Sequence, residues 1–264
     1  MKSIPLYPRL AGAVLALAAV FAAAPDARAE ETLKIGTLAP AASPWGQVFK
    51  VWSAAVDKKS DGKLILQFFY NGQQGDEGAM VGKIKAGQLD GAAVTAVGLS
   101  KIYKPIGAMQ MPGLFSTWSK LDSARDAMKS EFEKGCSDAG FSLIGWGDVG
   151  AVHLMSKGFE VHVPDDLKGK KPYMWREDVI QPKLFEVIGV TGVPLNVPEV
   201  LPQLNTGAVN VVTAPALAAE QLQWASRLDT IVTDTEAMAI GALVFSSKRI
   251  DGLPGDLRTI LLDT

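Results

Sequence analysis

The sequence has one cysteine and two histidines among its 264 residues, and this scarcity excludes several kinds of chemistry. Cys136 cannot form a disulfide within the chain because there is no second cysteine. His153 and His162 have no cysteine or aspartate at a motif spacing beside them. The sequence therefore offers neither a nucleophile–base pair nor a cluster of metal ligands. We expect no enzyme, no bound metal and no cofactor.

The sequence also lacks a large excess of one charge and a second long apolar run. The 26 basic and 28 acidic residues give a formal net charge of -2, which predicts no broad basic surface for nucleic acid. The glycines at positions 72 and 75 lack the lysine and the strand–helix context of a phosphate-binding loop. After residue 24 no apolar run is long enough to span a membrane.

The first thirty residues carry the pattern of a secretory signal peptide. Lys2 and Arg9 precede an apolar run over residues 10–24, and a small-x-small cleavage site ends at Ala29. The run is shorter than the roughly 20 residues that a membrane span needs. We expect residues 1–29 to be cleaved and the mature protein to lie in the periplasm; an uncleaved N-terminal anchor is the alternative.

Strand-like and helix-like patterns alternate along the mature chain. Ser43 has the character of a helix N-cap, and Pro44 follows at the first helical position, where its missing N–H costs nothing. The alternation favours a mostly parallel sheet with right-handed crossovers. The expected strands are residues 32–38, 64–70, 92–97, 172–175, 193–195, 209–213 and 239–246; the expected helices follow Ser43 and cover residues 76–86, 120–134, 178–188, 198–204, 216–227 and 257–264.

One segment, residues 141–157, is predicted to be extended over an unusual length, enough to cross between two sheets. A weak internal repeat also indicates two related lobes. In each half a helix ends at a glycine, Gly87 or Gly207, and an apolar residue, an Asp or Asn and a buried strand follow. Two lobes joined by long strands form a hinge, and the cleft between them is the expected ligand site.

Ligands of open α/β sheets bind at the carboxyl ends of the strands. The aromatic and small polar residues near the ends of the predicted strands are therefore the candidate ligand contacts. Such a lining suits a larger, more apolar ligand oriented by a few hydroxyls. Packing in the core is the alternative role for the three tryptophans. The candidates are Ser43, Trp45, Thr95, Ser100, Trp146, Tyr173, Trp175 and Thr213.

Several short motifs follow one another in a fixed order over residues 31–264. They are Ser43-Pro44-Trp45, Gly75-Asp76 with Met80, Met111-Pro112-Gly113-Leu114-Phe115, Asp165-Asp166-Leu167-Lys168-Gly169, and Leu201 through Gly207 leading into Thr213-Ala214-Pro215. By their order and spacing the chain resembles the periplasmic solute-binding proteins of the tripartite ATP-independent periplasmic (TRAP) transporters, the dicarboxylate-binding protein family.

This resemblance implies an α/β, two-lobed periplasmic-binding-protein fold, type II-like, in which crossing strands form the hinge. Residues 30–150 would be mainly lobe 1 and residues 151–235 mainly lobe 2. Residues 236–264 would return to lobe 1 as a strand and a helix and end in an apparently truncated C-terminus.

The resemblance also implies a function without catalysis. The lobes would close on an organic acid or a more apolar small molecule and deliver it to integral membrane permease subunits of a TRAP transporter. A ligand-binding protein that feeds a sensor kinase or a chemoreceptor, or one that serves an ABC importer, would share every feature described so far.

The chain departs from the family where a ligand carboxylate is usually bound. Most members carry an arginine on the strand after the Leu-Lys-Gly motif, and here that position is Tyr173, with Arg176 three residues later. The asparagine that usually precedes the later proline is Ala214, before Pro215. Odd spacing along a strand would put Arg176 on the face opposite Tyr173 unless the strand ends or bulges first. Either Arg176 takes the role through a bulge, or the ligand is not a simple dicarboxylate; we then expect a monocarboxylate or an aromatic or otherwise hydrophobic compound. We add Arg176 and Pro215 to the candidate ligand contacts.

Overall fold

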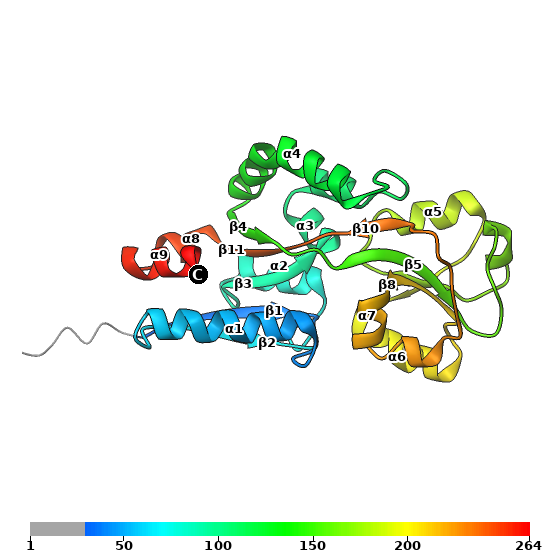
Figure 1. Cartoon of the computed structure of the whole chain (residues 1–264), viewed down its shortest axis with the longest axis horizontal. Helices are drawn as coiled ribbons and strands as arrows, with labels where there is room; N and C mark the ends of the chain where they lie inside the picture. The colour runs from blue at the N-terminus through cyan, green and yellow to red at the C-terminus, as the bar shows by residue number, and fades with distance from the viewer. Residues whose placement is uncertain (1–29) are drawn as a thin grey trace, which may run out of the picture. The chain divides into compact units, whose positions relative to one another are not determined.

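A five-stranded sheet organises the first half of the chain (Figure 1). The computed structural model describes residues 30–264, so the predicted signal peptide lies outside the described residues. In the strand order β2-β1-β3-β11-β4, the first three strands run parallel and β11 is antiparallel to both of its neighbours. The strands are β1 (Glu31–Thr37), β2 (Leu64–Phe69), β3 (Gly91–Thr95), β4 (Phe141–Trp146) and β11 (Gly241–Ser246).

Two smaller sheets organise the second half. A four-stranded antiparallel sheet has the order β10-β5-β8, with β9 also paired to β5. A parallel pair, β6 with β7, lies beside it, joined through a bridge between Pro172 and Val211. The strands are β5 (Gly150–Ser156), β6 (Tyr173–Trp175), β7 (Val193–Leu195), β8 (Val211–Pro215), β9 (Thr230–Ile231) and β10 (Ala237–Ala239).

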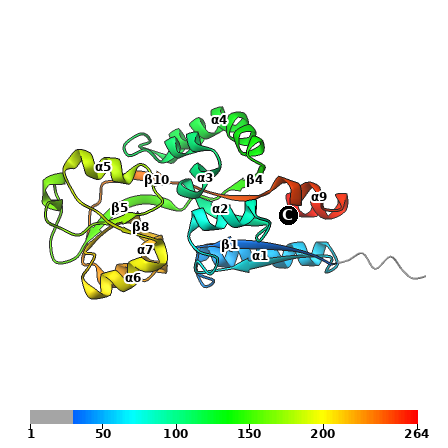
Figure 2. The same cartoon turned by 180° about the vertical axis from the view of Figure 1, so that it is seen from behind.

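Two adjacent chain segments connect the five-stranded and four-stranded sheets (Figures 1 and 2). One runs from β4 to β5 and the other from β10 to β11. They bond to each other where they cross, because the Gly147 N–H donates to the Gly241 carbonyl at 2.8 Å and the Val149 N–H donates to the Ala239 carbonyl at 2.8 Å. A side chain at Gly241 would place Cβ 2.5 Å from the Gly147 carbonyl oxygen, so this approach requires glycine.

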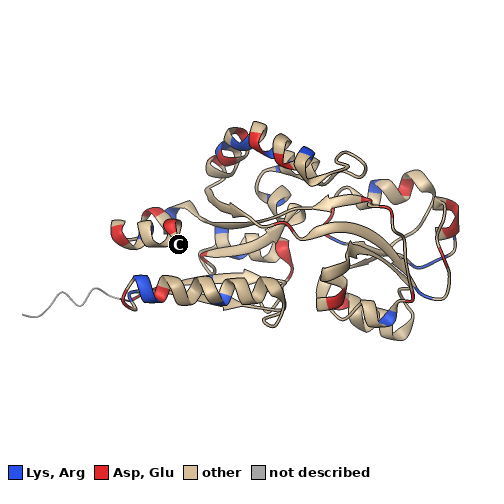
Figure 3. Ribbon diagram, in the orientation of Figure 1, with Lys and Arg blue, Asp and Glu red and all other residues tan. Residues whose placement is uncertain are grey.

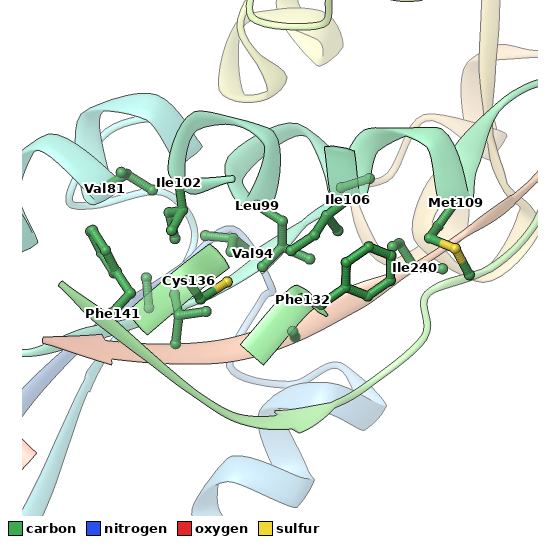
Figure 4. Close-up of a cluster of buried hydrophobic side chains, with 14 of the residues drawn as sticks. Val81, Val94, Leu99, Ile102, Ile106, Met109, Phe132, Cys136, Phe141 and Ile240 are labelled. Atoms are coloured by element: carbon green, nitrogen blue, oxygen red, sulfur yellow. The ribbon is translucent and has the colours of Figure 1, made fainter. Parts of the chain in front are cut away.

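Helices cover both faces of the five-stranded sheet. Strand residues alternate between the faces, so Leu33 and Ile35 pack with α1 and α9, while Val94 packs with α2, α3, η1 and α4. Figure 4 shows the second of these cores, in which Phe132 and Cys136 of α4 meet Leu99. The helices on this sheet are α1 (Pro44–Lys59), α2 (Glu77–Lys85), α3 (Ala96–Ile102), the 3-10 helix η1 (Lys104–Gln110), α4 (Trp118–Asp138), α8 (Ser247–Asp251) and α9 (Gly255–Asp263).

The remaining helices pack on the smaller sheets: α6 and α7 contribute to a core that contains Val200, Leu204 and Trp224, and η2 and α5 contribute Leu167 and Ile188 to a separate cluster with Val211. They are η2 (Pro164–Leu167), α5 (Gln181–Ile188), α6 (Val197–Thr206), α7 (Ala216–Gln221) and η3 (Ala225–Arg227). Figure 3 shows charged residues of both signs mainly on helices and connections, with few on the strands. Within residues 30–264, no helix combines the length and the apolar character needed to cross a membrane.

The predicted start of α1 is confirmed, since the Ser43 side chain caps the helix and Pro44 begins it. The prediction of a mostly parallel sheet is wrong. β11 lies antiparallel between β3 and β4, and every strand paired with β5 is also antiparallel to it. The single extended segment over residues 141–157 is in fact two strands, because residues 147–149 leave one sheet before the next begins.

Candidate functional site

A cavity of about 980 Å³ lies where residues from the two halves of the chain meet. Trp45 of α1 and Thr95 at the end of β3 contribute to one wall; Tyr173, Trp175 and Thr213 contribute to the other. Its volume is at the upper end of the range of small-molecule sites, which is about 300–1,000 Å³. The cavity continues outward between α1 and α9, where its wall includes exposed apolar side chains such as Val48 and Leu262.

Most of the candidate residues lie in this cavity. They come from strand ends and turns of both halves, as expected for an α/β fold. Those that line it are Trp45, Thr95, Trp146, Tyr173, Trp175, Thr213 and Pro215.

Two candidate serines do not line the cavity and instead build local structure. The Ser43 hydroxyl is buried, accepts from the Gly46 N–H at 3.1 Å and donates to the Pro40 carbonyl at 2.6 Å, so it fixes the start of α1. The Ser100 hydroxyl donates to the Ala96 carbonyl within α3 at 2.6 Å. Neither hydroxyl faces the cavity that Trp45 lines.

Arg176 also lies outside the cavity. Its guanidinium donates to the Pro194 carbonyl at 3.0 Å and lies 3.6 Å from the Glu199 carboxylate, and its side chain is 52% exposed. Strand β6 ends at Trp175 and pairs with β7 in a regular register, with no bulge to turn the next residue inward. Arg176 is an odd number of residues from Tyr173, so the two side chains point in different directions.

Hydrogen bonds connect the start of α2 to the second half of the chain. The Asp76 carboxylate accepts from the Trp175 Nε1–H and from the Val197 N–H, each at 3.0 Å. The Glu177 carboxylate accepts from the Gly78 N–H at 2.5 Å. Trp175 thus contributes twice, because its ring lines the cavity while its N–H holds Asp76.

Glu77 is a buried carboxyl group at the wall of the cavity. It accepts from the Thr95 N–H and hydroxyl, each at 2.9 Å, and from the Gly98 N–H at 2.7 Å. Burial raises the pKa of Glu77 to about 8, although these three hydrogen bonds act to lower it. Glu77 thus fixes Thr95 and the first turn of α3.

A largely buried arginine packs against Trp146. Arg125 of α4 donates to both oxygens of Asp148, at 2.8 and 2.9 Å, and its guanidinium carbon lies 4.9 Å from the centre of the Trp146 ring. The ion pair holds the Arg125 guanidinium against the Trp146 ring, and the Trp146 side chain also lines the cavity. Arg125 itself does not line the cavity.

Several polar residues that were not predicted as ligand contacts also line the cavity. Gln181 donates from Nε2 to the Thr213 hydroxyl at 2.8 Å and accepts from the Trp175 N–H at 2.8 Å. Asp178 caps the turn before α5 through its bond to the Ile180 N–H. Only the Gly75-Asp76 motif gave a local sequence signal next to such a residue, Glu77. The residues not singled out are Glu77, Gln110, Asp178, Gln181 and Glu236.

Within residues 30–264, no group of three or more His, Cys, Asp or Glu side chains is arranged to hold a metal ion.

Comparison with known proteins identifies relatives of limited identity. Residues 35–264 match the family described as bacterial extracellular solute-binding protein, family 7. A solute-binding protein of Chromohalobacter salexigens is 22% identical over 172 residues, which cover 65% of this chain and 51% of that protein. The protein YiiZ of Salmonella typhimurium is 28% identical over 160 residues, covering 59% of this chain and 48% of that protein. The chain therefore spans about half the length of these relatives.

Solved structures share the fold. The sugar acid binding protein DctPAm of Advenella mimigardefordensis, in complex with galactonate, aligns with a TM-score of 0.82 at 18% identity over 89% of this chain and 76% of that chain. A TRAP periplasmic solute-binding protein of Sulfurospirillum deleyianum with bound succinate gives a TM-score of 0.82 at 19% identity, with the same coverage.

The expected two-lobed α/β periplasmic-binding-protein fold is therefore confirmed. The match over residues 35–264 shows that this protein belongs to the bacterial extracellular solute-binding protein family 7, a family of solute-binding proteins and not of enzymes.

Proposed function

We propose that the chain is the extracytoplasmic solute-binding subunit of a TRAP-type secondary transporter. It captures an organic acid or a more apolar small molecule between its lobes and delivers it to integral membrane permease subunits. The observation that supports this role is the cavity of about 980 Å³ whose walls come from both halves of the chain. A site built in this way is completed only when the two halves approach each other.

Lobe closure is the proposed mechanism. The two segments that connect the sheets would act as the hinge between lobe 1, mainly residues 30–150 with 236–264, and lobe 2, mainly residues 151–235. A ligand that contacts both walls binds the closed form more tightly than the open form, and this difference in affinity drives closure. The bonds of Asp76 and Glu177 across the two halves would then add to the stability of the closed form.

The lining favours the more apolar part of the proposed ligand range. Trp45, Trp146 and Trp175 supply large apolar faces, and Thr213 and Gln181 supply polar groups. Arg176, the arginine nearest to the family's usual carboxylate-binding position, is engaged outside the cavity with Glu199. The indole N–H groups of Trp45 and Trp146 and the Thr213 hydroxyl would therefore orient the ligand in place of a guanidinium.

Localisation follows from the same role. We propose that the signal peptide, residues 1–29, is cleaved and that the mature chain works in the periplasm, where the permease meets it.

The test is to recover the ligand that the protein binds in its own compartment. We would express the full chain with its leader, isolate it from the periplasmic fraction and record native mass spectra without dialysis. Extra mass that is released on denaturation identifies the ligand, and titration calorimetry then measures its affinity. Uptake of that compound should fall in cells that lack the gene. A chain that stays in the cytoplasm, or that binds no compound saturably, contradicts the proposal.

A further inference from the structure

The charged side chains that line the cavity all carry the same sign. They are Glu77, Asp178 and Glu236. Among residues 30–264, no lysine, arginine or histidine lines it. A site built for a small organic acid needs positive charge or a fork of donors at the carboxylate. Here the negative charges are those of Asp178 and Glu236, because burial keeps Glu77 largely protonated at pH 7.

Two arginines near cavity-lining residues are engaged elsewhere. Arg125 is paired with Asp148 behind the Trp146 ring. Arg176 lies on the outer side of β6 beside Glu199. Neither guanidinium lines the cavity, so neither compensates its negative charge directly.

Glu236 is the carboxylate most available to a ligand. It precedes β10, and within residues 30–264 no hydrogen-bond donor and no cation pairs with its side chain. Its burial raises its pKa, and the charge of Asp178 adds to that effect, so the two carboxylates are close enough to repel each other. A ligand cation between them would relieve this repulsion.

Two further polar atoms in the cavity wall are unpartnered. The Tyr173 hydroxyl and the Gln110 amide oxygen are buried and have no hydrogen-bond partner among the described residues. Tyr173 is only 3% exposed, and both residues line the cavity. Buried polar groups are nearly always hydrogen-bonded. The Gln110 oxygen can only accept, which favours a ligand that donates a hydrogen bond, whereas the Tyr173 hydroxyl can donate or accept.

The aromatic lining suits the same kind of ligand. Trp45, Trp146, Tyr173 and Trp175 present ring faces and edges to the cavity. The face of an indole or phenol ring attracts a cation within about 6 Å, most strongly for tryptophan. The same rings also bury the apolar body to which a cationic group is attached.

We propose that this cavity takes an organic amine in its protonated form, with the ammonium group toward Glu236 and Asp178 and the apolar body against the tryptophans. The proposal rests on the proposed solute-binding function and narrows its ligand class. At pH 7 a small carboxylate would meet the acidic side chains of Glu236 and Asp178 and no cation, whereas an ammonium donates to these carboxylates and to the Gln110 amide oxygen.

The test compares ligands that share one body and differ in charge. Tryptamine, tryptophol and indole-3-acetate carry a cation, a neutral alcohol and an anion on the same indole; octylamine, octanol and octanoate repeat the series on an aliphatic chain. We expect calorimetry at pH 7 to give the amine of at least one series an affinity about tenfold or more above that of its acid, with the alcohol between them.

A matched pair of variants locates the effect. Glu236→Gln keeps the shape of the side chain and should weaken amine binding about fivefold to tenfold while leaving the alcohol nearly unchanged. Glu133→Gln, on exposed α4, removes an equal charge outside the cavity and should change neither affinity.

The outcomes are distinct. Tighter binding of an acid than of its amine, or equal binding of amine and alcohol with no effect of Glu236→Gln, overturns the amine proposal and leaves the solute-binding function intact. If no compound of either series binds, the amine proposal is overturned as well. The binding function fails only if the native mass spectra and the wider ligand set also show no saturable binding.

Discussion

At Glu77, burial and hydrogen bonding oppose each other in a single side chain. The residue is 1% exposed, and its desolvation outweighs the three donors from Thr95 and Gly98. The folded chain therefore holds a proton that the unfolded chain would release at lower pH. This carboxyl group makes the stability of the protein depend on pH near neutrality.

The free energy of unfolding should fall as the pH rises from about 4.5 to about 8. In this window the unfolded chain has lost the Glu77 proton and the folded chain retains it, so each pH unit lowers the free energy of unfolding by roughly 1 kcal/mol through this group. Above pH 8 Glu77 is ionised in both the folded and the unfolded chain, so the free energy of unfolding stops falling because of this group. Urea denaturation of the wild type and of Glu77→Gln at pH 5 and pH 8 measures the effect. The destabilisation caused by the glutamine should shrink at pH 8; a constant difference would show that Glu77 does not titrate in this window.

Trp175 should stabilise the fold through its N–H as well as through its ring. Trp175→Phe keeps an aromatic face but removes the donor to the buried Asp76 carboxylate, which then keeps the Val197 N–H as its remaining partner in the second half of the chain. We expect a loss of about 1–3 kcal/mol in the free energy of unfolding without ligand, because a buried charged acceptor loses a donor. Trp118→Phe, on the exposed start of α4, is the control and should cost little. Equal effects of the two variants would contradict the proposed role of the indole N–H.

The positions of single candidate residues could be predicted where a local pattern determined them. Trp175, at the end of the predicted strand over residues 172–175, was expected in the cavity wall, and the odd spacing from Tyr173 already indicated that Arg176 would point elsewhere unless a bulge intervened. Glu236 could not be found in this way. It reaches the cavity only because β10 pairs with β5, a contact between residues distant in sequence.

At the scale of elements, the crossing of the two connecting segments depends on close backbone contact. Gly241 begins β11 and lies against Gly147, and a Cβ at that position would approach the Gly147 carbonyl oxygen to 2.5 Å. Real side-chain carbons do not approach so closely, so one of the segments would have to move.

Gly241→Ala should therefore destabilise the chain by roughly 1–3 kcal/mol, the usual cost of forcing an extra carbon into a packed region. Gly145→Ala in β4 is the matched control, since a Cβ there meets no heavy atom within 4 Å. Thermal unfolding of the two variants measures the difference. A Gly241→Ala variant as stable as Gly145→Ala would show that the crossing tolerates displacement.

Elements with local signals were predicted well, and those determined by distant pairing were not. α1 has its cap at Ser43, and α2 has its cap at Asp76. The sequence did not show that β3 ends at Thr95, because α3 follows without a turn and its first residues are as apolar as the strand. The direction of β11 was missed for a different reason: strand patterns carry no information about which neighbour pairs with them.

At the scale of the whole molecule, the two halves of the chain are joined by few direct hydrogen bonds besides the crossing segments. The bond from the Gly78 N–H to the Glu177 carboxylate is one of them. Glu177 also accepts from Lys101 Nζ through its backbone carbonyl at 2.8 Å, a bond that a change of side chain preserves. This residue therefore offers a way to weaken the contact between the halves without altering the cavity wall, of which it is not a part.

Glu177→Ala should shift the proposed equilibrium from the closed toward the open form. The Gly78–Glu177 bond involves a charged acceptor, so its loss is worth about 1.5 kcal/mol and should weaken ligand affinity roughly tenfold by reducing the closed population. Because the variant leaves the cavity-lining side chains unchanged, ligands of different chemistry should all weaken by a similar factor. Calorimetry with two unrelated ligands, and small-angle scattering with and without ligand, measure both effects; Glu133→Ala on α4 is the control. Loss of affinity for one ligand only would place Glu177 at the ligand and not at the hinge, and unchanged affinity for both would mean that this bond does not hold the halves together.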